Sequence, residues 1–120
     1  MIDQEKIHSQ CLSDDPKQRR KALKTLINNF SLLPNKYEAW DDLIILINDI
    51  NSSVRSKATL TLISVFSEMP DKQQAWKDLI KSTNNEDSWV RSKVASALIS
   101  AFSEMPDKQQ AWKDLIRLLD

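Results

Sequence analysis

The chain has 120 residues, with 17 lysines and arginines, 17 aspartates and glutamates, one histidine, one cysteine and no glycine. This length suits one domain with a core of its own. The balanced charge excludes a globally basic nucleic-acid binder, and the single cysteine excludes an internal disulfide framework and a CxxC zinc or redox site. The lack of glycine excludes phosphate-binding loops and the nucleophile elbow, whose backbones need glycine.

Two kinds of targeting segment are not visible. No apolar run approaches the roughly 18 residues of a membrane-spanning helix. The first ten residues carry acids early and lack the apolar stretch of a secretory signal. We therefore expect a soluble, cytoplasmic protein without membrane contacts.

A repeat of 36 residues organises the sequence. Residues 66–80 read FSEMPDKQQAWKDLI, and residues 102–116 repeat these letters without a change. A diverged copy at 30–44 reads FSLLPNKYEAWDDLI. An identity of this length at a shared offset does not arise by chance. We predict one repeat domain over 1–120, with a partial repeat at 1–14 and further repeats near 15–50, 51–86 and 87–120.

Caps and apolar stripes predict the helices in chain order. Each long helical pattern opens on Asp or Asn, and Pro16 stands at the favoured first helical position of the first one. Each complete short pattern opens on Asn or Asp with Glu or Gln three residues later, the spacing of a capping box. Apolar residues then recur on one helical face. We predict helices at 3–12, 15–32, 35–47, 51–68, 71–83, 87–104 and 107–119.

Packing follows from these helices. No helical pair can bury its apolar stripe alone, so neighbouring pairs must stack into one continuous core. The turns are too short for crossover connections. The predicted fold is all-α: a right-handed α-solenoid of about 3.5 two-helix repeats, with seven antiparallel helices.

Two segments carry a resemblance to a known family. Residues 51–58 read NSSVRSKA, and residues 87–98 read DSWVRSKVASAL. This order of an Asn or acidic turn, Val-Arg and small residues resembles the HEAT repeat, in particular the short HEAT-like repeats of prokaryotic proteins related to phycobilisome lyases. The resemblance covers nearly the whole chain. It implies that the Val-Arg helices line a concave face and that the repeats form a binding scaffold.

Other repeat families fit less well. Tetratricopeptide repeats have 34 residues and a different aromatic pattern. Pumilio-type RNA-binding repeats are near 36 residues long, but they need polar or stacking side chains where this chain has mostly Ser, Ala, Thr and Lys.

Basic residues recur at the repeat spacing. The family resemblance implies that Arg19, Arg55 and Arg91 each bond the preceding turn; Asp49 and Asn85 lie six residues before the last two. The lysines two residues further on point away from these arginines, because two residues turn a helix by roughly 200°. They would stand roughly 10 Å apart and could bind an acidic segment, or they could simply be solvated. The predicted contact residues are the lysines of this row, Lys21, Lys57 and Lys93, together with Arg20 and Lys24 of the first long helix.

The tryptophans divide into two kinds. Trp40, Trp76 and Trp112 lie on the apolar stripes, and we expect all three in the core. Trp89 aligns with polar residues, so we expect an exposed side chain that either anchors a partner or packs on the preceding turn. Trp89 completes the predicted binding residues.

No catalytic or metal site is predicted. His8 and Cys11 align with stripe positions and are expected on the inner face. The chain has no third Cys or His that would complete a structural zinc site. A catalytic His-Cys pair would also need an orienting group and an oxyanion hole, and neither is visible. We predict no cofactor.

The sequence therefore favours a non-enzymatic protein-interaction scaffold, whose groove binds an acidic or amphipathic segment of another protein. The alternative is binding of the nucleic-acid backbone through the same basic row. Other readings are an enzyme accessory and a structural spacer. The last short helix is strongly apolar and lacks a polar cap, so we expect partial exposure of Leu115, Ile116, Leu118 and Leu119. Such a face predicts self-association through this end or a continuation of the repeats that would cover it.

Overall fold

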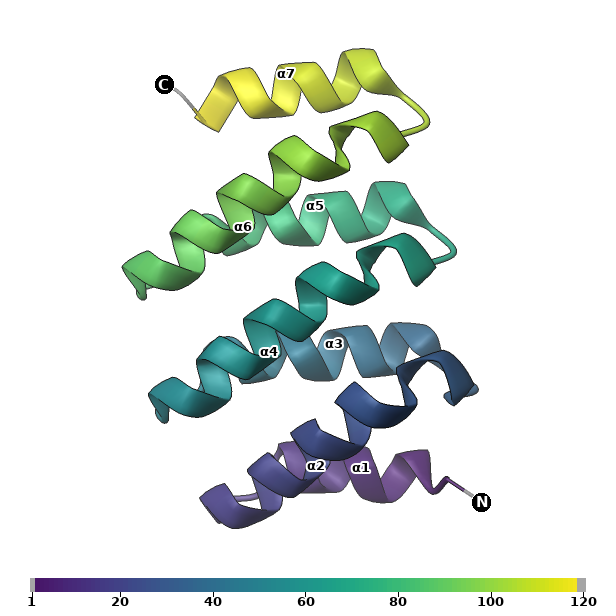
Figure 1. The fold of residues 1–120 in the computed structure, drawn as a ribbon, viewed down its shortest axis with the longest axis vertical. Coiled ribbons are helices and arrows are strands. Elements are labelled where there is room, and N and C mark those ends of the chain that lie inside the picture. The colour runs from purple at the N-terminus through teal and green to yellow at the C-terminus, as the bar shows by residue number, and fades with distance from the viewer. Residues whose placement is uncertain (1, 119–120) are drawn as a thin grey trace. The chain divides into compact units, whose positions relative to one another are not determined.

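A computed structural model describes residues 2–118. Within this range the chain has seven α-helices, three short 3-10 helices and no strand, which confirms the all-α class and the predicted helices to within a few residues (Figure 1). The α-helices are α1 (Gln4–Cys11), α2 (Pro16–Asn29), α3 (Lys36–Leu46), α4 (Ser52–Val65), α5 (Lys72–Ser82), α6 (Ser88–Ala101) and α7 (Lys108–Leu118). The 3-10 helices are η1 (Phe30–Leu32), η2 (Phe66–Glu68) and η3 (Phe102–Glu104).

The predicted caps start these helices. The Asp15 carboxylate accepts the Lys17 N–H at 2.9 Å, and Asp71 accepts the Gln74 N–H at 3.0 Å. Each long helix then ends in a 3-10 turn. The sequence prediction included this turn in the α-helix, because one tighter turn shifts the apolar face only slightly and leaves the apolar spacing nearly unchanged.

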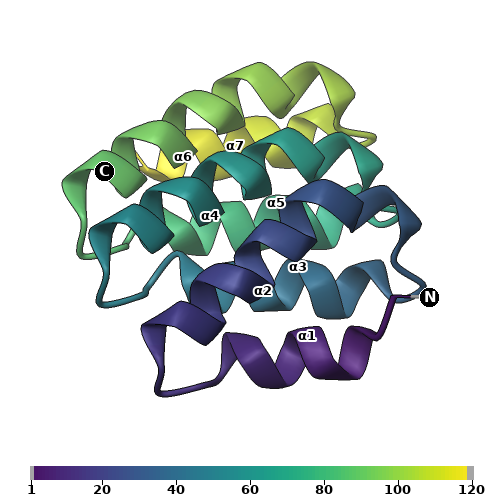
Figure 2. The same ribbon diagram turned by 60° about the horizontal axis from the view of Figure 1, so that its bottom comes forward.

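The chain forms two compact units, Met1–Glu68 and Met69–Asp120. In the N-terminal unit, α1 packs against α2 and α3, while α4 packs against α2 and α3. Helices α1 and α3 therefore form one layer, and α2 and α4 form the other (Figures 1 and 2). The fully buried side chains of Leu26, Leu43 and Leu62 belong to the core of this unit.

In the C-terminal unit, α5 packs against α6, and α7 contacts η3. The indole Nε1–H of Trp76 on α5 donates a hydrogen bond of 3.0 Å to Asp114 on α7. Leu79, Val94 and Leu98 are buried in this unit, which places the predicted stripes of α5 and α6 inward.

One core prediction is wrong. Trp40 and Trp76 are 1% and 0% exposed, but Trp112 is 58% exposed. Its ring makes an edge contact with Phe102, with ring centroids 6.3 Å apart, and within residues 2–118 no further helix covers the outer face of α7. The stripe motif alone could not distinguish a covered helix from an uncovered one.

The apolar face of α7 is partly exposed, as expected, in the residues that the structure describes. Ile116 and Leu118 are 42% and 40% exposed, and Leu115 is partly buried. Leu119 lies outside the described residues. Within the described part, no helix combines the length and the apolar character needed to cross a membrane.

Candidate functional site

The three repeated arginines fasten the turns that precede their helices. Each guanidinium Nη1 donates a hydrogen bond to the main-chain carbonyl six residues earlier. The family resemblance implied a bond to this turn but did not specify that the backbone would accept it. The carbonyl needs no particular side chain, which explains why Ser13 serves in the first repeat. The bonds are Arg19–Ser13 at 2.9 Å, Arg55–Asp49 at 2.8 Å and Arg91–Asn85 at 2.8 Å.

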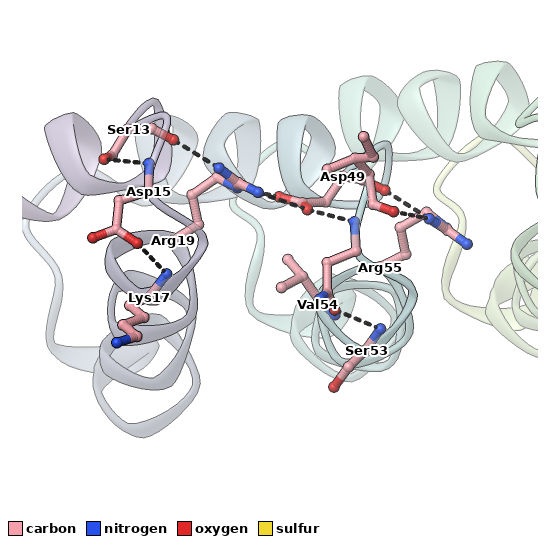
Figure 3. Close-up of polar contacts among 10 residues, drawn as sticks. Ser13, Asp15, Lys17, Arg19, Asp49, Ser53, Val54 and Arg55 are labelled. Carbon is pink, nitrogen blue, oxygen red and sulfur yellow. Dashed lines mark hydrogen bonds and ion pairs between the residues drawn. The ribbon is translucent and has the colours of Figure 1, made fainter.

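Arg19 also reaches the following turn of the N-terminal unit (Figure 3). Its Nε and Nη2 donate to the Asp49 carboxylate at 2.6 and 3.3 Å, and the Asp49 side chain is only 4% exposed. The same carboxylate accepts the Asn51 N–H at 2.8 Å. These bonds hold α2 against the start of α4 and fix the spacing of the two long helices.

The space between those two helices contains a hollow of about 440 Å³. Its cationic residues are three that the sequence predicted for binding: Arg20, Lys24 and Lys57. Its other lining residues are Leu23, Ile27, Ser53 and Val54. None of the lining residues is acidic.

The hollow combines charge with apolar surface. Leu23 and Val54 are nearly fully buried and form its base, while Ile27 is 45% exposed. The three cationic residues are exposed. Such a site can bind a segment that carries carboxylates or phosphates beside an apolar group, because the cations attract the anion and Ile27 offers apolar contact.

The other predicted binding residues lie elsewhere. Lys21 is exposed on α2 but does not line the hollow. Trp89 and Lys93 belong to α6 of the C-terminal unit, where the Lys93 Nζ lies 5.6 Å from the centroid of the Trp89 ring. Trp89 is 37% exposed, as predicted, and the ammonium stacks on its ring in a cation–π contact. The row of three lysines stays a prediction.

A second hollow lies in the C-terminal unit, between α5 and α7, with a volume of about 650 Å³. Sequence reasoning missed it. The sequence did contain a sign of this hollow: the two identical short-helix segments carry polar residues at helical spacing beside the apolar stripe. The lining residues are Gln73, Gln74, Lys77, Ile80, Lys81, Gln110, Asp114 and Arg117.

His8 does not pack as a simple core residue. Its side chain is 42% exposed, and its Nδ1 lies 2.6 Å from Oδ1 of the buried Asp42 on α3. The hydrogen bond and charge of Asp42 raise the pKa of His8. The pKa of Asp42 is itself raised, because burial outweighs the opposing effect of His8. Glu38 lies beside this pair, and sequence reasoning missed both carboxylates because they are distant in the chain from His8.

Cys11 lies on the inner face, as predicted, and is 1% exposed. Burial, with a smaller contribution from the negative charge of Asp42, raises the pKa of its thiol to about 12. A buried thiol that stays protonated at neutral pH is a poor nucleophile, and Cys11 does not belong to the group of described residues that could share a metal ion.

No family model matches the chain, and neither the curated proteins nor the solved structures gave a significant match. The resemblance to HEAT-like repeats therefore stays a prediction from the sequence.

Proposed function

We propose that the chain is a non-enzymatic, cytoplasmic scaffold for protein–protein interaction. In this proposal its HEAT-like repeats form a right-handed α-solenoid of about 3.5 two-helix units, and the long helices α2, α4 and α6 line a concave groove. The groove binds an acidic or amphipathic segment of a partner protein. The observation that supports this proposal is the cationic hollow between α2 and α4, with Arg20, Lys24 and Lys57 around an apolar base.

The chemistry of the hollow favours an amphipathic partner over a purely acidic one. A purely acidic segment would gain only exposed ion pairs, which contribute little because water and salt screen them. An apolar side chain seated against Ile27 would add contact area that salt does not screen. Trp89 is a second apolar anchor in this proposal.

Charge reversal tests the proposed contact residues. The first variant changes Arg20, Lys24 and Lys57 to Glu, and a second changes the repeated lysines Lys21, Lys57 and Lys93. A control variant makes the same total charge change at three exposed lysines of the short helices: Lys6, Lys81 and Lys113. Proteins from a lysate of the source cell are captured with each variant, with and without nuclease, after circular dichroism has verified the fold.

A partner that is captured by the wild type and the control, and lost with the first variant, supports the hollow as the binding site. Loss with the lysine-row variant and retention with the first would move the interface to Lys21 and Lys93. Equal capture by all three variants contradicts the proposed contact residues and directs attention to Trp89 and α7.

Nucleic-acid backbone binding is the alternative, because the same three cations could contact phosphates. Its signature is an affinity that falls steeply with salt. Capture that disappears with nuclease, together with duplex binding at about 50 mM salt that weakens as salt rises, would favour this alternative. Undetectable duplex binding under those conditions would exclude it.

Self-association through α7 belongs to the same proposal. Trp112, Ile116 and Leu118 are all exposed on this helix, and a second copy could cover them. Sedimentation analysis over a range of concentrations tests this, with Trp112→Glu as the variant that should remain monomeric. A monomeric wild type at high concentration would contradict it.

A further inference from the structure

The cluster of His8, Glu38 and Asp42 lies outside the hollow and joins α1 to α3. Each of the three residues offers one ligand atom, and these atoms lie within 4.8 Å of one another. Glu38 and Asp42 are four residues apart and therefore share one face of α3. His8 faces them from α1, which packs against α3.

Asp42 has an oxygen without a partner. The residue is fully buried, its Oδ1 is bonded to His8, and its Oδ2 is not hydrogen-bonded in the described structure. A buried carboxylate oxygen without a donor is costly, and native proteins normally satisfy it. The environment of Asp42 thus supplies one partner, His8, and lacks a second positive or hydrogen-donating group for Oδ2.

The sequence repeat shows what is missing. Asp114 occupies the same repeat position as Asp42, and both of its oxygens are satisfied: Trp76 Nε1 donates to Oδ2 and Gln110 Nε2 donates to Oδ1, each at 3.0 Å. In the first complete repeat, Glu38 stands where Gln110 stands in the last. An ionised Glu accepts hydrogen bonds but cannot donate one, so the exchange removes a donor and adds a second negative charge beside Asp42.

We propose that His8, Glu38 and Asp42 bind a divalent transition-metal ion, with Zn²⁺ as the ion that suits them best. One imidazole nitrogen and two carboxylate oxygens are ligands that Zn²⁺ accepts, and water completes its tetrahedral coordination. The ion satisfies Oδ2 of Asp42 and neutralises the two neighbouring carboxylates. The half-exposed His8 and the partly buried Glu38 give the ion a route from solvent.

Binding requires only a small rearrangement. Tetrahedral ligand bonds of about 2.0–2.2 Å place the ligand atoms roughly 3.3–3.6 Å from one another, whereas Nδ1 of His8 and Oδ1 of Asp42 are 2.6 Å apart and all three ligand atoms lie within 4.8 Å of one another. The imidazole therefore moves slightly outward. If the ion binds at Nδ1, it displaces the proton of that nitrogen to solvent, and its bonds to Nδ1 and to Oδ2 of Asp42 replace the hydrogen bond between His8 and Oδ1.

The experiment uses the full chain, without a histidine tag, and Zn²⁺ itself as the titrant. Calorimetry measures the affinity, and a long-range ¹H–¹⁵N spectrum follows the imidazole, which is unambiguous because the chain has one histidine. The variants are His8→Gln and Glu38→Gln; the second introduces the residue that other repeats already carry, so folding should be preserved. Glu104→Gln is the control, since it makes the same change at an exposed site of the other unit.

We expect one Zn²⁺ per chain, shifted His8 ring resonances, and an affinity at least tenfold weaker in both variants but unchanged in the control. Co²⁺ as a substitute should give visible absorption without a sulfur charge-transfer band, since Cys11 is not a ligand. Absence of saturable binding to the wild type overturns the proposal. So does binding of equal strength in all variants, because the ion would then lie elsewhere.

Discussion

The guanidinium of Arg19 and the carboxylate of Asp49, thirty residues apart, form a two-point ion pair between consecutive turns of the N-terminal unit. Arg19 is 13% exposed and Asp49 only 4%. Because Arg19 also holds the Ser13 carbonyl, one side chain links the start of its own helix to the next turn. The repeated arginine is therefore a structural residue here, and the exposed cations beside it are the ones in the proposed binding site.

Removing this ion pair from one side should destabilise the protein. Arg19→Ala leaves Asp49 buried and unpaired, so we expect the free energy of unfolding to fall by about 3 kcal/mol. Arg20→Ala, one residue along and exposed, should change it by less than about 0.5 kcal/mol. Urea unfolding followed by circular dichroism measures both. Equal losses of stability in Arg19→Ala and Arg20→Ala would mean that the Arg19–Asp49 pair adds no more stability than a surface contact does.

The His8–Asp42 pair predicts a pH dependence of stability. The folded-state pKa of His8 lies above its ordinary value of 6.5, so its contribution is complete below that pH and declines as pH rises through the folded pKa. The raised pKa of Asp42 also favours the protonated form on folding, so its contribution declines from its ordinary pKa of 3.8 upward, and the decline due to His8 adds to it at higher pH. We expect the His8 contribution to stability to be lost from about pH 6.5 upward.

Urea unfolding at a series of pH values, with a chelator present, measures this decline. His8→Gln should remove the part of the decline that begins near pH 6.5, because Gln does not titrate, whereas the part that Asp42 causes at lower pH should remain. A decline of the same size in the variant would assign the pH dependence to other groups.

Cys11 should be unreactive in the folded protein. Its thiol is buried and its pKa is raised to about 12, so little thiolate exists at neutral pH. A chromogenic disulfide reagent should label the native chain only as fast as it opens, and label the urea-unfolded chain at once. Rapid labelling of one thiol per native chain would contradict this burial.

The helices and the all-α class were largely predictable, because the repeat supplies the same caps and stripes several times over. Asp15 and Asp71 cap their helices as their positions indicated. The candidate site was less predictable. Arg20 and Lys24 were identified as basic residues, but only the packing of α2 on α4 reveals that they share a hollow with Lys57.

The sequence could not predict the contacts between side chains that are distant in the chain. Asp49 bonds the arginine that follows it through its main-chain carbonyl, but its side chain binds the earlier Arg19, which was not expected. Asp42 meets His8 across 34 residues. One clue was present: Glu38 departs from the glutamine found at its repeat position, and such a departure identifies the place where a repeat acquires different chemistry.

The two identical short-helix segments provide a matched test of burial. Trp76 and Trp112 lie in the same local sequence, so helix propensity and neighbouring residues affect both equally. Trp76 is fully buried and bonded to Asp114, whereas Trp112 is 58% exposed. Trp76→Ala should therefore lower the free energy of unfolding by about 3–5 kcal/mol, and Trp112→Ala by about 1 kcal/mol or less. Urea unfolding at low protein concentration compares them without self-association. Because the local sequence is the same in both segments, the difference between the two losses of stability measures the tertiary contacts of Trp76, including its hydrogen bond to Asp114. Similar losses of stability in the two variants would mean that something outside residues 2–118 covers α7 in solution.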